Sequence, residues 1–224
     1  MKIFNFGSSQ SIGFGHNSDF DKCPYKIFHT AFPRQISHKL GYKLYNFARP
    51  GESFHFAINR FYLNKHLLFH NDIVFFHINS DSFIPPVLHE GKLHKYYNAS
   101  EIDAEDDREL KTKMMNYIVN YYDEQNEIYH AMSKLIPFLE HVTLLPFRMF
   151  IYTCKPFPVI TQTEDNSVNI MTEHFHHLLR QANVLSIHEF LNDDPEIDER
   201  HYGIDQHNQL TKYFMEELGY DGLV

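Results

Sequence analysis

Residues 2–13, KIFNFGSSQSIG, decide the fold class of this 224-residue chain. The first five of them, KIFNF, are largely apolar and predict a short strand. A glycine, three serines and two more glycines follow within residues 7–15, although the whole chain has only 9 glycines. Glycine lets a backbone turn sharply and approach a bound molecule closely. We therefore expect a strand that leads directly into a functional loop.

The following residues alternate between helical and strand patterns. The expected segments are a helix at 31–40, a strand at 42–48, a helix at 54–69 and a strand at 72–78. In the first helix, Phe32, Ile36 and Leu40 recur at a spacing of four residues. The last segment, DIVFFHI, is an almost continuous apolar run, which is typical of a strand buried on both faces of a parallel sheet. This alternation predicts an α/β fold with a doubly wound sheet.

The second part of the chain is expected to complete the same sheet around a helical insertion. Its expected elements are an irregular stretch at 81–104, a helical region at about 105–140 that ends or breaks near Pro137, a strand at 141–147, an irregular excursion at 148–165, a helix at 167–182, a strand at 183–187 and a closing helix at 206–218. No clean domain boundary interrupts this order. We expect one domain over residues 1–224, with about five parallel strands and a helical insertion at about 81–140.

Composition narrows the class of function. The chain is 43% hydrophobic and 22% charged, as is ordinary for a globular domain, and its net charge is −9 with histidines neutral. An acidic balance argues against a nucleic-acid partner, which would need a basic face. No apolar run reaches the length of a membrane span, and no secretory signal is visible, so we expect a cytoplasmic protein. Cys23 and Cys154 are the only cysteines, and we expect both as reduced thiols.

Small and polar residues follow each expected strand. The strand ends lead into GSSQS, RPGES and INSDS, and the last strand is followed, after an acidic loop, by GIDQHNQ. In open α/β sheets, ligands bind at the carboxyl ends of the strands. A serine there becomes a nucleophile if a histidine accepts its proton and a carboxylate fixes the histidine tautomer. Backbone N–H groups and side-chain amides can stabilise the resulting oxyanion.

These stretches resemble the sequence blocks of the SGNH (GDSL-type) hydrolases. Residues 7–13, GSSQSIG, are similar to the family's first block, Gly-Asp-Ser followed two residues later by a small hydroxyl residue and glycine, with Ser8 in place of the aspartate. The resemblance implies that Ser9 is the nucleophile. Residues 46–51, NFARPG, are similar to the second block and imply that the N–H of Gly51 is an oxyanion donor.

Two further blocks complete the resemblance. Residues 77–81, HINSD, stand where the family has Gly-x-Asn-Asp, and imply that Asn79 or Ser80 fills the third oxyanion position. Asp205-Gln206-His207 fits the shorter form of the fifth block, which is Asp-x-x-His in many members and Asp-x-His in others. The resemblance thus implies a Ser9–His207–Asp205 triad, and an oxyanion hole formed by Ser9, Gly51 and Asn79. It spans nearly the whole chain except residues 81–140.

The resemblance implies a serine esterase with a three-layer, flavodoxin-like fold of about five parallel strands. It implies small acyl esters as substrates, for example O-acetyl groups on a sugar or glycan, with no metal or organic cofactor. Two alternatives stay open: an O-acyltransferase that uses the same site, and a catalytically silent binding protein on this fold. The changed first and third blocks are what make the silent alternative reasonable. The sequence leaves the oligomeric state undecided.

Several of these residues also have plain structural interpretations. Ser9 and Asn79 could serve as loop or turn residues, and Gly51 could be a turn glycine after Pro50. Asp205 could cap the last helix. The stretch Glu173-His174-Phe175-His176-His177 places potential zinc ligands on one helix, but no third or fourth ligand is evident, so we expect a solvated helical face and no metal. Both acidic stretches, 101–109 and 192–199, are expected to be solvated.

Overall fold

The computed structural model describes residues 1–12, 29–49, 53–78, 87–90, 92–94, 106–121, 124–153, 166–187 and 203–220. The chain divides into two compact units. The first comprises Met1–Asn79, Leu144–Pro156 and Asn183–Val224, and the second comprises Ser80–Thr143 and Phe157–Ala182.

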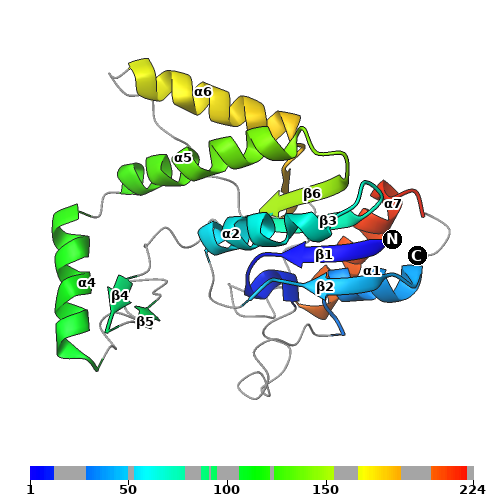
Figure 1. Ribbon diagram of the computed structural model, residues 1–224, viewed down its shortest axis with the longest axis horizontal. Coiled ribbons are helices and arrows are strands. Elements are labelled where there is room, and N and C mark those ends of the chain that lie inside the picture. The colour runs from blue at the N-terminus through cyan, green and yellow to red at the C-terminus, as the bar shows by residue number, and fades with distance from the viewer. Residues whose placement is uncertain are drawn as a thin grey trace. The chain divides into compact units, whose positions relative to one another are not determined.

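A five-stranded parallel sheet forms the centre of the first unit (Figure 1). Its strands are β1 (Lys2–Phe6), β2 (Lys43–Asn46), β3 (Ile73–Ile78), β6 (Arg148–Thr153) and β7 (Leu185–Ser186). They lie in the order β2-β1-β3-β6-β7, and every neighbouring pair is parallel. This is the flavodoxin-like order, in which the chain turns from one direction across the sheet to the other between β1 and β3. The predicted parallel sheet is confirmed.

Helices cover both faces of this sheet. Helices α1 (Phe32–Leu40) and α7 (Ile204–Glu217) pack on one face, where Phe32 and Phe214 meet Phe75 of β3. Helix α2 (Phe54–Asn64) packs on the other face, where the ring of Phe61 contacts Phe6 and Phe76. All six residues of β3 are buried, because its side chains point alternately into these two apolar layers. The predicted three-layer α/β/α fold is therefore confirmed.

The second unit is mostly helical among the residues described. It holds α4 (Arg108–Tyr121), α5 (Glu124–Val142), α6 (Asn166–Gln181) and a small antiparallel pair, β4 (Val87–His89) and β5 (Lys92–His94). Helices α5 and α6 pack together, and Nε2 of His174 lies 2.9 Å from Oε1 of Glu140 between them. Helix α5 continues through Pro137, which corrects the predicted break there.

The predicted strand at 141–147 is wrong. His141 and Val142 form the last turn of α5, Leu144 is 84% exposed, and the fourth strand of the large sheet is instead Arg148–Thr153. A short apolar run at the end of a helix has the same composition as a buried strand. The apolar residues at the end of α5 were therefore interpreted as a strand. None of the helices in the described part of the chain has the length and apolar character needed to cross a membrane.

Candidate active site

The carboxyl ends of β1 and β3 lie side by side in the first unit. Phe6, the last residue of β1, pairs with Phe76 of β3, so the chain leaves β1 beside His77. This is the point where the strand order reverses, and ligands of open α/β sheets bind at such a point. The serine-rich loop and the stretch after β3 therefore begin at the place where the fold favours a site.

Gly7 is the first residue of the loop, and its position excludes a side chain. A Cβ atom at Gly7 would lie 2.5 Å from Cβ of His77, far inside van der Waals contact. The φ angle of Gly7 is 150°, which residues with a side chain rarely adopt. Both facts require glycine here, and the close approach of loop and strand depends on it.

Ser8 and His77 form a buried hydrogen-bonded pair. Ser8 Oγ lies 3.0 Å from Nδ1 of His77, with relative exposures of 1% and 0%. The imidazole also stacks on the ring of Tyr152, with centroids 5.0 Å apart. Burial lowers the pKa of His77 to about 3, because the surrounding protein disfavours the charged ring. His77 is therefore neutral at physiological pH, and one atom of the pair donates while the other accepts.

The backbone after Ser8 is held by its own hydrogen bonds. Residues Ser9–Ile12 form one turn of 3-10 helix, in which Ser11 Oγ donates to the Ser8 carbonyl at 2.8 Å. Asn5 Nδ2 donates to the Ser11 carbonyl and also to Asn46 Oδ1 at the end of β2. These bonds anchor the Ser9 backbone, while the Ser9 side chain lies outside the described part of the structure.

The second block runs beside the first. Phe47 N–H donates to the Asn5 carbonyl at 2.7 Å, and Arg49 N–H donates to the Gly7 carbonyl at 3.0 Å. The chain thus stays paired with the serine loop up to two residues before Gly51. Gly51, Asn79 and Ser80, the predicted oxyanion donors beyond Ser9, lie outside the described residues.

The two departures from the family blocks contact each other. Ser8 stands where the first block has aspartate, and His77 stands where the third block has glycine when Asn79 is aligned with the asparagine. Serine has a shorter side chain than aspartate, and glycine has no side chain where this chain has the imidazole of His77. The sequence shows both departures, but only the strand register shows that they are paired.

Helix α7 carries both remaining members of the predicted triad. Gly203 is its N-cap residue, and the N–H of Gly203 donates to Oε1 of Gln206 at 2.6 Å. Asp205 lies in the first turn with its side chain exposed, where an acidic group is favourable for the helix dipole, and it is not the cap.

His207 is buried in the same helix. The N–H of Phe32 donates to Nδ1 of His207 at 3.3 Å, and the two rings stack with centroids 6.1 Å apart. Because Nδ1 accepts this bond, the proton of a neutral imidazole resides on Nε2. The predicted triad needs the opposite arrangement, with Nδ1 donating to Asp205 and Nε2 accepting from Ser9. The Asp205–His207–Ser9 relay stays a prediction.

A longer match to the fifth block lies just upstream of α7. Asp198-Glu199-Arg200-His201 has the Asp-x-x-His spacing and ends two residues before the N-cap Gly203. This Asp-x-x-His spacing is visible in the sequence, but the expectation for the fifth block rested on the shorter Asp205–His207 match instead. Residues 198–201 lie outside the part of the chain that the structure describes.

The histidine-rich stretch of α6 has a simple arrangement. His174 pairs with Glu140 of α5 at the surface, and Phe175 supplies the buried contact. Within the described ranges, no group of three or more His, Cys, Asp or Glu side chains could hold a metal ion.

Comparisons with known proteins concern the fold. No protein-family model matches the chain, and no curated protein matches it. One solved structure matches with a TM-score of 0.50, over 97% of this chain and 68% of that one. It is a carbohydrate esterase whose active site displays divergent catalytic and non-catalytic binding functions, and its sequence is 11% identical to this one.

Two further solved structures have lower TM-scores. They are the psychrotrophic esterase EstA from Pseudoalteromonas sp., at 10% identity over 97% of this chain and 98% of that one with a TM-score of 0.47, and a putative GDSL-like lipase from Parabacteroides merdae, at 13% identity over 99% and 95% with a TM-score of 0.47. The chain therefore has the α/β fold found in a carbohydrate esterase.

Proposed function

We propose that this protein is a serine hydrolase that cleaves small acyl esters through an acyl-enzyme at the carboxyl ends of β1 and β3. The observation that carries the proposal is the anchored Gly7–Ser8–Ser9 turn at the point where the strand order reverses. An acyl-transfer site needs a nucleophile on a backbone that cannot shift, with N–H donors facing it. The hydrogen bonds around Ser8 supply that rigidity.

Ser9 is the proposed nucleophile. Its hydroxyl oxygen attacks the ester carbonyl while a histidine takes the hydroxyl proton, and the leaving alcohol then receives that proton. Water attacks the acyl-enzyme in the same way and releases the acid. The N–H groups of Ser9 and Gly51 and the side chain of Asn79, or else Ser80, are the proposed oxyanion donors. No cofactor enters this scheme.

The general base comes from the C-terminal segment, and two histidines compete for the role. The first is His207, oriented by Asp205. The second is His201, oriented by Asp198. The hydrogen bond from Phe32 N–H to Nδ1 of His207 favours His201, because it occupies the nitrogen that the orienting carboxylate would need.

Ser8 and His77 are proposed to act as positioning residues. Ser8 immediately precedes the nucleophile, and its bond to His77 ties the loop to the end of β3, immediately before the proposed oxyanion donor Asn79. His77 is neutral and buried, so its role is to hold the peptide that joins Ser8 to Ser9.

O-acyl sugars are the first substrate class to test, because a carbohydrate esterase shares this fold. The experiment is hydrolysis of p-nitrophenyl acetate and of an O-acetylated sugar by purified protein, with labelling by a fluorophosphonate probe. Ser9→Ala should remove labelling and lower the rate by about a thousandfold or more. The control is Ser133→Ala, an exposed serine on α5, which should change neither.

The same experiment separates the alternatives. A wild-type protein that is neither labelled nor active on varied esters favours the silent binding protein. Acyl transfer to an added sugar in preference to water favours the acyltransferase. An unchanged rate in Ser9→Ala would contradict the nucleophile assignment.

A further inference from the structure

Asn5 is a buried amide in a strand whose other buried residues are apolar. Its side chain is 0% exposed, and it lies on the same face of β1 as Ile3, two residues earlier. Ile3 and Phe75 belong to the apolar core that β1 and β3 share with α1 and α7. Asn5 pairs in register with Phe75 on one side and with Asn46 of β2 on the other. An apolar residue is the ordinary occupant of such a position.

The NH2 group of Asn5 joins two loops that follow different strands. Asn5 Nδ2 donates to the Ser11 carbonyl at 3.2 Å, in the serine loop after β1, and to Asn46 Oδ1 at 2.9 Å, at the end of β2. Asn46 Oδ1 also accepts from the N–H of Ala48 at 3.2 Å. Each hydrogen of the one NH2 group therefore serves a different loop.

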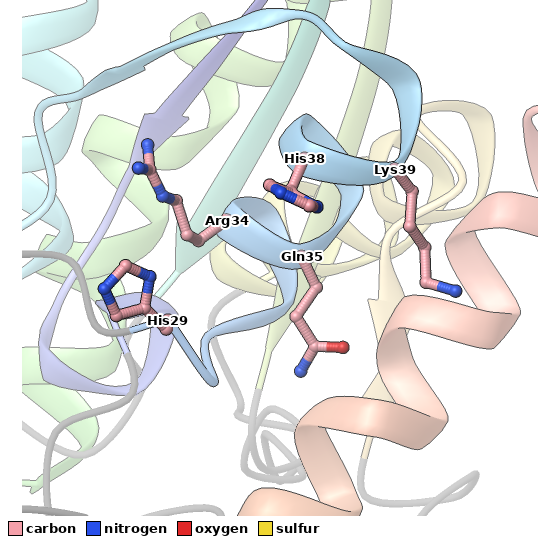
Figure 2. A pocket seen from close by; sticks show the side chains of 5 residues that line it. All are labelled: His29, Arg34, Gln35, His38 and Lys39. Carbon is pink, nitrogen blue, oxygen red and sulfur yellow. The ribbon is translucent and has the colours of Figure 1, made fainter.

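The oxygen of the same amide makes this arrangement unfavourable for folding alone. Asn5 Oδ1 is buried and accepts no hydrogen bond from any described residue, and a buried polar atom in that state destabilises the folded protein. Gln35 of α1, shown in Figure 2, is a contrasting amide. Its Nε2 donates to the Thr30 carbonyl and to Asn208 Oδ1, and its Oε1 accepts from Thr211 Oγ1. Proteins tend to keep locally unfavourable groups where function requires them.

We propose that Asn5 is a positioning residue for the oxyanion hole, with Asn46 as its acceptor. The bond to the Ser11 carbonyl holds the turn that carries Ser9. The bond to Asn46 holds the end of β2, from which the chain continues to Gly51. The amide thereby sets the separation of the two backbone N–H donors, which must be in place before negative charge develops on the substrate oxygen. This inference rests on the proposed esterase function.

The first test is steady-state hydrolysis of p-nitrophenyl acetate by Asn5→Leu, with kcat and KM measured separately. Leucine has nearly the size of asparagine but cannot donate, so both hydrogen bonds are lost while the space stays filled. The kcat should fall about tenfold to a hundredfold, and labelling by the fluorophosphonate probe should slow in parallel. KM should change less than about twofold, because the oxyanion exists only in the transition state and not in the bound ester.

Asn46 provides a pair of variants that separates the hydrogen bond from the space it occupies. Asn46→Asp keeps an oxygen that accepts from Asn5 Nδ2 and from the N–H of Ala48, and it loses only an NH2 group whose bond to the Ala48 carbonyl is 3.5 Å long. Asn46→Ala removes the acceptor. Asn46→Asp should keep kcat within about threefold of the wild type, and Asn46→Ala should lower it at least about fivefold. This pair decides the question if Asn5→Leu does not fold.

Asp72→Ala is the matched control at the opposite edge of the same strands. Asp72 is 3% exposed, and its carboxylate accepts from the N–H of Lys2 at 2.8 Å and from the N–H of Phe69 at 3.0 Å. It thus ties the start of β1 to the chain before β3, far along both strands from the proposed site. Asp72→Ala should lower the urea midpoint of unfolding but keep kcat within about twofold.

Three results would overturn the proposal while leaving the esterase assignment intact. They are an active wild type whose Asn5→Leu variant keeps its kcat, an Asn46→Asp variant as slow as Asn46→Ala, and an Asp72→Ala variant as slow as Asn5→Leu. A wild type that neither hydrolyses esters nor reacts with the probe would overturn the esterase assignment, and the positioning role with it.

Discussion

Ser8 Oγ and Nδ1 of His77 lie 3.0 Å apart, with both side chains buried where β1 and β3 end. The two residues are 69 positions apart in the sequence, so the contact exists only because β1 and β3 are neighbours in the sheet. It joins the loop that carries the proposed nucleophile to the strand that leads to a proposed oxyanion donor. The pair therefore links the stability of the fold to the geometry of the site.

The first prediction concerns the energy of this pair. Ser8→Ala removes the hydroxyl from a buried imidazole nitrogen and should lower the free energy of unfolding by about 1–3 kcal/mol. The double variant Ser8→Ala with His77→Phe should lose less than the two single losses added together, because both polar partners are then replaced by apolar groups. Urea unfolding of the four proteins measures the coupling. Strictly additive losses would show that the 3.0 Å contact contributes no coupling energy.

The second prediction is a pH dependence of stability. The pKa of His77 is lowered to about 3 in the folded protein, so below pH 6.5 the unfolded chain binds a proton there that the folded chain does not. The free energy of unfolding should therefore fall as the pH falls, by roughly 1.5 kcal/mol between pH 6.5 and 5 from this residue alone. Urea unfolding at pH 7, 6 and 5 should show a shallower dependence for His77→Phe than for the wild type. Equal slopes would mean that His77 titrates normally in the folded state.

The third prediction concerns Gly7. Gly7→Ala places a methyl group 2.5 Å from Cβ of His77 at a φ angle of 150°, and should destabilise the protein by at least about 2 kcal/mol. Gly41→Ala is the control: its φ angle is 65°, but nothing lies within 4 Å, so its cost should be limited to about 1 kcal/mol of backbone strain. Thermal or urea unfolding compares the two. A smaller loss at Gly7 than at Gly41 would show that the β1–β3 contact is not tight.

The sheet could be predicted from the sequence where the signal was local. Strands β1 and β3 can be recognised from their runs of apolar residues. The expected helices can be recognised from apolar residues at a spacing of about four. Both patterns are local in the sequence. The fourth strand could not be placed correctly, because the end of α5 and a buried strand are both short apolar runs. Leu144, which lies within the predicted strand at 141–147, is 84% exposed.

The site could be predicted only in part, for a different reason. Positions after strand ends are visible in the sequence, and they led to the serine loop. Contacts across the sheet are not visible, so neither the Ser8–His77 bond nor the Phe32–His207 bond was expected. The chain has 17 histidines, and sequence alone does not tell a buried histidine in a helix from one at a site. His207 stands out among them only through the Asp-x-His spacing from Asp205 and its place at the start of the last helix.

The fourth prediction decides between the two candidate bases. The hydrogen bond from Phe32 N–H gives His207 a packing role. Loss of the buried imidazole in His207→Asn should lower the free energy of unfolding by about 1–3 kcal/mol. The variant should keep most of the esterase rate, because the amide oxygen of asparagine can accept the same bond and so preserve the local structure. His201→Ala should instead lower the rate by about a thousandfold or more with little change in stability. Rates on p-nitrophenyl acetate and urea unfolding, measured on the same preparations, give both numbers.

Asp205→Asn supplies the matched control for this comparison. Asp205 is exposed in the first turn of α7, so its replacement should change stability by less than about 1 kcal/mol through the helix dipole alone. If His201 is the base, Asp205→Asn also leaves the rate nearly unchanged, and Asp198→Asn lowers it. If His207→Asn and Asp205→Asn both abolish activity while His201→Ala is active, the relay runs through His207. The Phe32 N–H would then have to release Nδ1 when substrate binds, because one nitrogen cannot accept that bond and donate to a carboxylate at the same time.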